Sequence, residues 1–168
     1  SSDLIGPPLH DIVSELLPVS DVDLTSKIMT SFKQHYDETG YLHTKVYHRI
    51  FEAIESLKAN KFNLLIATNK RSIPTKKIIN LMDWNDLFSG IYSLDSFNPV
   101  FSTKSKLLAH MVYSLNVSSK EIIYIGDRTE DYAAANSIGC NFILAEWGYL
   151  NESDKVSCST HIHSPDMI

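Results

Sequence analysis

Hydrophobic and polar positions follow a helical rhythm in the first third of the chain. Apolar residues recur three or four positions apart, which places them on one face of a helix. This spacing predicts helices over residues 9–17, 23–38 and 46–60. The first begins after two prolines, and the second ends before Gly40, a residue type that commonly terminates helices. The chain up to about residue 58 is therefore expected to contain helices only.

The pattern then changes, because short apolar runs alternate with amphipathic stretches. Runs of this kind that end in small polar residues are typical of buried parallel strands. Strands are expected within residues 61–69, 89–95, 121–127 and 140–147, helices at 73–84, 102–116 and 129–139, and a last short strand at 161–164. Strands that alternate with such helices predict an α/β fold, a doubly wound parallel sheet covered on both faces. In such sheets, ligands bind at the carboxyl ends of the strands.

One of these strand ends carries two aspartates. Residues 121–127 finish with Gly126 and Asp127, and Asp131 follows one helical turn later. Glycine permits a sharp turn, and carboxylates four residues apart can converge on one point. Such a pair suits Mg²⁺, which also takes water and phosphate oxygens. Asp131 could instead only stabilise the helix N-terminus. The combination of strand, glycine and spacing favours Asp127 and Asp131 as metal ligands.

Two other strand regions indicate contacts to phosphate. Thr68 and Asn69 close the strand within residues 61–69, where a hydroxyl and nearby N–H groups can bind phosphate oxygens. Taken by themselves, these residues favour an ordinary helix cap or turn. Lys104 precedes the helix within residues 102–116 and can neutralise phosphate, with Lys106 as the competing candidate. Together with the aspartates, Thr68 and Asn69 are predicted to contact phosphate, and the residues alone leave Lys104 and Lys106 both open as the neutralising cation.

Composition narrows the class of protein further. The chain has 168 residues, with 15 Lys and Arg against 20 Asp and Glu, so its formal net charge of -5 argues against a nucleic-acid surface. No apolar run approaches the roughly 20 residues that span a bilayer, so no membrane partner is expected. Only two cysteines occur, which makes a disulfide framework improbable and a reducing cytoplasm the expected compartment.

The ordered motifs "LLIATNK", "KSKLLAHMVYSLNV" and "IIYIGDRTEDYAAANSIGC" closely resemble the haloacid dehalogenase-like (HAD) phosphohydrolases. The phosphoglycolate-phosphatase-like branch is the best match, since it also shows "IGPPL" in its cap and a "KVYxxI" stretch where the cap returns to the core. The resemblance implies a partial helical cap over residues 1–45 and an HAD-like core over residues 46–168. It also implies that Thr68 binds the transferring phosphoryl group and that Lys104 stabilises it.

In the same family an acidic pair holds Mg²⁺, directly or through water, and Asp127 and Asp131 match that pair. Thr68, Lys104 and Asp127 are therefore the expected catalytic residues. The family's nucleophile is an aspartate in a D-x-D-x-T motif at the tip of the central first strand, and an aspartyl-phosphate forms on it. Mg²⁺ and the lysine balance the negative charge.

The stretch "DVDLT" at residues 21–25 matches the letters of that motif, but its context does not fit. The preceding "ELLPVS" contains a proline and a serine instead of an apolar strand. Ser20 or Asp21 is better suited to cap the helix that follows. The given sequence is therefore expected to lack the nucleophile and the central first strand, which the family sets between the strands ending at Thr68 and Asp127.

The leading hypothesis is a Mg²⁺-dependent phosphohydrolase that acts on a small phosphorylated metabolite. The alternative is a catalytically inactive relative or fragment that binds phosphate or a partner. Tyr36, Tyr41 and His43 are candidate cap or cap-hinge residues for substrate selection, although residues of these types more often serve in packing or lie on the surface. His161 and His163 are expected on the surface of the last strand. The sequence indicates neither which phosphomonoester is used nor an oligomeric state.

Overall fold

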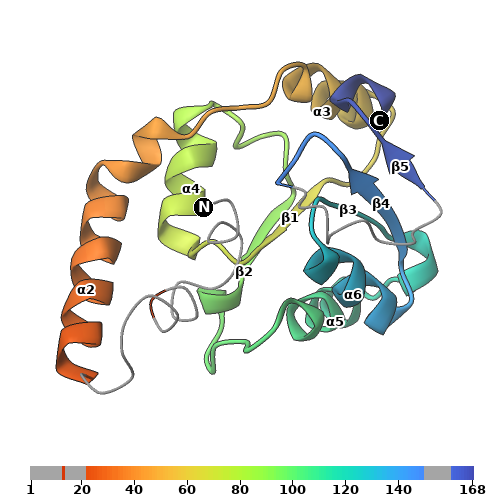
Figure 1. Cartoon of the computed structure of the whole chain (residues 1–168). Coiled ribbons are helices and arrows are strands. Elements are labelled where there is room, and N and C mark those ends of the chain that lie inside the picture. Colours follow the sequence, from red (N-terminus) through yellow and green to blue (C-terminus); the bar gives the residue numbers. More distant parts are fainter. Residues whose placement is uncertain (1–12, 14–21, 150–159) are drawn as a thin grey trace.

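The structure is a computed structural model that describes residue 13, residues 22–149 and residues 160–168. Figure 1 shows the arrangement of its elements. The longer helices are α2 (Val22–Glu38), α3 (Ile50–Ala59), α4 (Ser72–Leu81), α5 (Lys104–Leu115) and α6 (Thr129–Ile138). Short 3-10 turns include η2 (Gly40–His43), η3 (Leu94–Ser96), η4 (Ser119–Glu121) and η6 (Pro165–Met167).

The strands are short, parallel and divided between two sheets. They are β1 (Leu65–Thr68), β2 (Gly90–Ser93), β3 (Ile123–Gly126), β4 (Asn141–Ala145) and β5 (His161–Ile162). One sheet pairs β1 with β2, and the other has the order β3-β4-β5. Each expected strand is present, including the short last one, and the parallel α/β architecture is confirmed. Within the described residues, β1 and β3 are not joined by strand pairing.

A common layer of helices supports both sheets. Helices α5 and α6 pack against each other, α5 contacts β1 and β2, and α6 contacts β3 and β4 (Figure 1). Leu107 of α5 is completely buried at the centre of this layer. The core cluster consists of Leu94, Leu107, Leu108, Met111 and Ala134, with Leu65, Ala67, Tyr92 and Tyr124 among the side chains packed against it. The two sheets therefore share one hydrophobic core, although no strand pairing connects them.

The helices before the strands agree with the sequence pattern except at their ends. Helix α3 begins at Ile50 instead of near Val46, because Arg49 adopts a left-handed backbone conformation with φ of 62° that a helix does not continue through. Val13 is helical and buried, and the rest of the helix expected over residues 9–17 lies outside the described residues.

Helix α2 lies apart from the sheets and reaches the core through α4 (Figure 1). None of its residues is buried, and Val22, Leu24 and Phe32 are exposed apolar side chains. Among the described residues, no helix combines the length and apolar character needed to cross a membrane.

Candidate active site

Asp131 is the centre of the polar cluster at the carboxyl end of β3. Its Oδ1 accepts from Lys104 Nζ at 2.5 Å and from the Tyr124 hydroxyl at 3.0 Å. Its Oδ2 accepts from the backbone N–H groups of Asp127 and Arg128, each at 3.2 Å. Asp131 is only 4% exposed, so the first turn of α6 holds a buried carboxylate that is fully surrounded by donors.

The side-chain neighbours of Asp131 are a buried lysine and a tyrosine hydroxyl, and both donate to it. Lys104 begins α5 and is nearly as buried as its partner, with side-chain exposures of 11% and 5%. Burial, followed by the charge of Asp131, raises the pKa of Tyr124 well above its ordinary value. The phenol therefore stays protonated and donates. Lys106 points elsewhere and donates to Ser102 at 3.0 Å, so the structure places Lys104, and not Lys106, beside the acidic pair.

Asp127 is held by the loop that follows β4, a contact that the sequence did not reveal. Its Oδ2 accepts from the backbone N–H of Tyr149 at 2.7 Å. A Cβ on Gly148 would overlap the Asp127 side chain, so only glycine fits there without a shift. The pKa of Tyr47 is raised, first by burial of its hydroxyl and then by charge interactions with Tyr149 and Asp127. The connection between α2 and α3 therefore runs close to this strand end.

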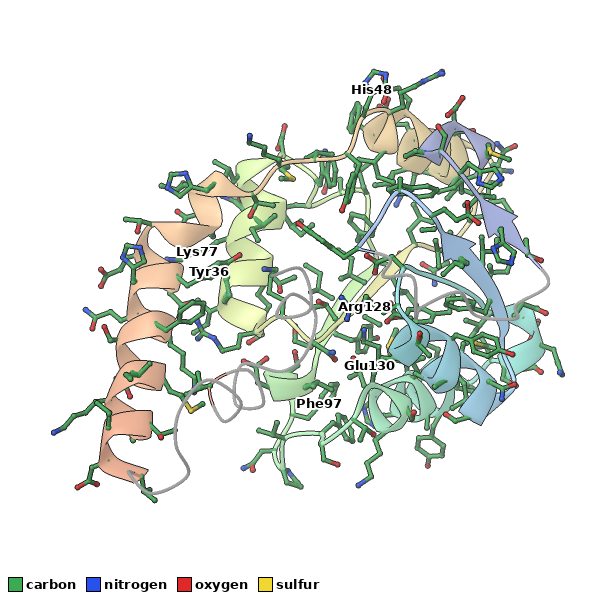
Figure 2. The ribbon with its side chains drawn as sticks, viewed as in Figure 1. Tyr36, His48, Lys77, Phe97, Arg128 and Glu130 are labelled. Carbon is green, nitrogen blue, oxygen red and sulfur yellow. The ribbon has the colours of Figure 1, made fainter. Side chains whose placement is uncertain are left out.

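The carboxyl end of β1 lies next to that of β3. Asn69 Nδ2 donates to Glu130 Oε1 at 2.9 Å, which links the residue after β1 to the first turn of α6. Figure 2 shows Glu130 and Arg128 where α6 begins. The Thr68 hydroxyl accepts from the backbone N–H of Lys70 at 3.0 Å, so the loop after β1 turns back over this side chain. The structure thus brings the loops that carry Thr68 and Asp127 to one edge of the fold.

The donor set has the chemistry that a Mg²⁺ ion uses, although the two aspartates differ. Asp127 presents carboxylate oxygen at a half-buried strand end, whereas both Asp131 oxygens already accept hydrogen bonds from protein groups. Across the described ranges, no group of three or more His, Cys, Asp or Glu side chains is arranged for a metal ion. Asp127 is therefore better placed as a direct ligand than Asp131.

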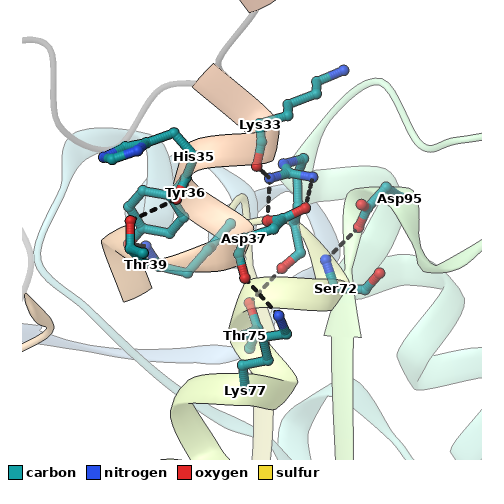
Figure 3. A network of polar contacts seen from close by, with 11 residues as sticks. Lys33, His35, Tyr36, Asp37, Thr39, Ser72, Thr75, Lys77 and Asp95 are labelled. Carbon is teal, nitrogen blue, oxygen red and sulfur yellow. Dashed lines mark hydrogen bonds and ion pairs between the residues drawn. The ribbon is translucent and has the colours of Figure 1, made fainter. Parts of the chain in front are cut away.

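The cap candidates lie on the contact between α2, η2 and α4. Tyr36 accepts from Lys70 Nζ at 2.7 Å, and Lys77 Nζ lies 5.1 Å from the centre of the Tyr41 ring. His43 is exposed. Asp37 lies in the polar network of Figure 3, and its carboxylate accepts from the guanidinium of Arg71, the residue before α4.

The stretch "DVDLT" could end a strand or begin a helix, and the structure describes its last four residues. Residues 22–25 form the first turn of α2, and Asp23 is exposed there. No strand precedes Asp23 within the described residues, and Asp21 lies outside them. The stretch thus contributes to a helix start, as the sequence indicated.

The last strand carries the two histidines beside a glutamate. His161 Nδ1 lies 2.9 Å from Glu146 Oε1, and His163 contacts the other carboxylate oxygen. Hydrogen bonds from His163 and His161 lower the pKa of Glu146, outweighing a desolvation effect that acts in the opposite direction. These groups hold β5 next to the end of β4.

Comparison with known proteins agrees with this geometry. A family model for haloacid dehalogenase-like hydrolases matches residues 1–145. The phosphoglycolate phosphatase of Aquifex aeolicus is 26% identical over 137 residues, which cover 82% of this chain and 64% of that protein. The phosphoglycolate phosphatase of Nitrosospira multiformis is 27% identical over 136 residues, or 81% of this chain and 59% of that protein. The chain thus spans about 60% of the length of these relatives.

Solved structures show the same fold. A predicted phosphatase from Clostridium acetobutylicum superposes with a TM-score of 0.87 at 25% identity, covering 99% of this chain and 77% of that one. A haloacid dehalogenase-like family protein from Streptococcus pneumoniae gives a TM-score of 0.86 at 20% identity, over 99% of this chain and 77% of that one. With the family model matched over most of its length, the chain belongs to the haloacid dehalogenase-like hydrolase family.

Proposed function

We propose that this chain forms the phosphoryl-binding part of a Mg²⁺-dependent phosphohydrolase that acts on a small phosphomonoester. The observation that carries the proposal is the buried Lys104–Asp131 pair at the tip of β3, next to Asp127 and joined to the β1 tip through Asn69 and Glu130. Family membership and the phosphatase names of the relatives support the same reaction class.

Each protein group has a definite role in this proposal. The Thr68 hydroxyl donates to a phosphoryl oxygen, together with N–H groups of the loop that ends in α4. Lys104 keeps one N–H on Asp131 and directs its remaining donors at the phosphoryl group. Asp131 acts through Lys104, because its own oxygens are engaged. The resulting site places fixed positive charge where negative charge develops in phosphoryl transfer.

The metal ion would be held mainly by Asp127, with Asp131 as its close neighbour. When bound, Mg²⁺ offsets negative charge on the phosphoryl oxygens. The backbone N–H of Tyr149 and the absence of a side chain at Gly148 keep the Asp127 carboxylate in position for this role.

We place the nucleophilic aspartate at the end of a strand that pairs between β1 and β3. These two strands are parallel members of separate sheets, yet they lie over one helical layer, and their carboxyl ends are linked by Asn69 and Glu130. A strand between them would satisfy their N–H and C=O groups, which are costly to bury unpaired. Its last residue would reach the edge where Thr68 and Asp127 lie.

Residues 1–45 would act as the cap over this site. In the described part of this segment, Tyr36 on α2 and Tyr41 on η2 contact the α4 side of the core. Closure of a cap excludes water and adds contacts to the substrate. The compartment that fits the two-cysteine composition is the cytoplasm.

Release of inorganic phosphate from an aryl phosphate by the complete natural protein tests the proposal. Hydrolysis should require Mg²⁺ and fall at least 100-fold in Asp127→Asn, whereas Asp23→Asn in α2 should retain the wild-type rate. Asp23 is a matched control because it is an exposed aspartate away from the strand ends. Hydrolysis that does not need Mg²⁺ would contradict the metal site, and a complete protein without any hydrolysis would instead be a phosphate- or partner-binding relative.

A further inference from the structure

Tyr124 is a half-buried tyrosine whose hydroxyl contacts the same carboxylate oxygen as Lys104. It lies on β3, where its ring packs against the core cluster and lies 6.1 Å from the ring of Phe142, centre to centre. Its hydroxyl donates to Asp131 Oδ1 at 3.0 Å. Lys104 Nζ donates to the same oxygen at 2.5 Å. A strand residue and a helix residue therefore share one oxygen of a buried carboxylate.

The Asp131 carboxylate uses its full capacity to accept hydrogen bonds. An ionised carboxylate offers about four lone-pair positions, two on each oxygen. Oδ1 accepts from Lys104 and Tyr124. Oδ2 accepts from the backbone N–H groups of Asp127 and Arg128. Because Asp131 is only 4% exposed, these four protein donors fix its orientation, and each of them limits where the others can lie.

The Tyr124 hydroxyl thereby limits how Lys104 bonds to its counter-ion. An ammonium has three N–H donors. With the second position of Oδ1 taken by Tyr124, Lys104 places one N–H on the carboxylate and turns the other two away from it. Without the hydroxyl, a second N–H of Lys104 could turn toward Asp131 and draw the ammonium onto the carboxylate. The direction of the free Lys104 donors therefore depends on Tyr124.

We propose that Tyr124 is a positioning residue for phosphoryl binding, and that its hydroxyl keeps the donors of Lys104 turned away from Asp131 and toward the phosphoryl group. This inference rests on the proposed function, which sets the phosphoryl group between Thr68 and Lys104. Tyr124 acts through Lys104 and does not contact the phosphoryl group, because its hydroxyl proton is engaged by Asp131.

A purely structural role for the hydroxyl is the competing explanation, because a buried hydrogen bond also stabilises the fold. Tyr92 provides the matched control. It is a half-buried tyrosine on β2, in the other sheet, and it packs against the same core cluster. Its ring stacks on that of Phe97, with centres 6.4 Å apart. Tyr92→Phe therefore removes a hydroxyl from the same core without touching the Asp131 carboxylate.

Calorimetric titration of the complete protein with inorganic phosphate, in the presence of Mg²⁺, separates these explanations. Tyr124→Phe removes the hydroxyl and keeps the ring, so phosphate affinity should fall about tenfold. Mg²⁺ affinity should stay within about threefold of wild type, since the loop after β4 also holds Asp127. Tyr92→Phe should keep both affinities within about threefold.

Hydrolysis of 4-nitrophenyl phosphate adds a double-mutant cycle that a structural role would not reproduce. We expect kcat/KM to fall about tenfold in Tyr124→Phe and about 100- to 1,000-fold in Lys104→Met. The double variant should lie within about threefold of Lys104→Met, because the hydroxyl acts only through the ammonium. A structural role predicts that the two losses multiply.

Three results would overturn the inference: an unchanged phosphate affinity in Tyr124→Phe, losses that multiply in the double variant, or a Tyr124→Phe protein that does not fold, which would assign the hydroxyl to stability. The outcome also distinguishes this inference from the proposed function. Weaker phosphate binding in Tyr124→Phe alone, in a protein without hydrolysis, refutes the phosphohydrolase and leaves the positioning role standing. Hydrolysis with losses that multiply does the reverse.

Discussion

Asp131 shows how one side chain can fix the geometry of a site without being its reactive group. It sits at the third position of α6, where a carboxylate commonly reaches back to backbone N–H groups of the preceding turn. Here it bonds two of them and also fixes the ammonium of Lys104 and the hydroxyl of Tyr124. The position of the Lys104 ammonium is thus set by residues of a different strand and helix.

Removing the cation tests this arrangement. Lys104→Met leaves a carboxylate that is 4% exposed without its counter-charge, which should lower the free energy of unfolding by about 3 kcal/mol. Lys104→Met combined with Asp131→Asn should recover part of this loss, since the charge that must be buried is gone. Denaturant titration measures all three proteins, with the exposed Lys106→Met expected within about 0.5 kcal/mol of wild type. Equal losses in Lys104→Met and Lys106→Met would contradict the buried pair.

Gly148 gives a second test at the scale of single residues. Gly148→Ala places a methyl group into the Asp127 side chain, so Asp127 must move. We expect Mg²⁺ affinity, measured by calorimetry, to fall at least tenfold while the melting temperature changes little.

Gly139→Ala is the control for this variant. Gly139 has φ of 69° but open space around it, so alanine should cost about 1 kcal/mol of stability through backbone strain and leave Mg²⁺ affinity unchanged. Equal loss of Mg²⁺ affinity in both variants would show that the effect of Gly148→Ala does not come from its contact with Asp127.

Most elements could be predicted from the sequence because their signals are local. The apolar run before Thr68 and the run before Asp127 each encode a buried strand, and the helix after each follows from its spacing of apolar residues. The contacts to Asp127 and Lys70 could not be predicted in this way. They come from Tyr149 and Tyr36, which are more than 20 residues away in sequence and meet the site only through the packing of other elements. The late start of α3 could not be predicted either, since Arg49 is not a residue type that usually signals a left-handed turn.

The pairing of β5 with β4 should respond to pH through Glu146. Its pKa is lower in the folded chain than the ordinary 4.5, so the carboxylate stabilises the folded state above pH 4.5. That contribution is lost as the pH falls through the lower folded value. Amide protection of Leu144 and Glu146, which bond the carbonyl groups of Thr160 and Ile162, should therefore decrease as the pH falls below 4.5.

Glu146→Gln serves as the comparison for this effect. Glutamine does not titrate, so the change in amide protection between pH 6 and pH 3.5 should become smaller in this variant. Because Glu146 is solvent-accessible, the effect is expected to be modest and to weaken further at high salt. An identical pH response in wild type and Glu146→Gln would show that another group controls the docking of β5.

At the scale of the whole molecule, the fold consists of two parallel sheets on a shared layer of α5 and α6, with the candidate site where their strand ends meet (Figure 1). Helix α2 contacts the loop that leads from β1 into α4, by the Asp37–Arg71 pair and the Tyr36–Lys70 contact. Family membership explains why the strands, the helical layer and the acidic strand end occur in this order. We propose that one edge of this fold binds a phosphoryl group between Thr68 and Lys104.

A crystal structure of the complete protein grown with Mg²⁺ and inorganic phosphate tests this most directly. The expected result is a phosphate within hydrogen-bond distance of the Thr68 hydroxyl and Lys104 Nζ, Mg²⁺ on Asp127, and a parallel strand paired between β1 and β3. Direct pairing of β1 with β3, or phosphate bound only at a site remote from Thr68 and Lys104, would contradict the account.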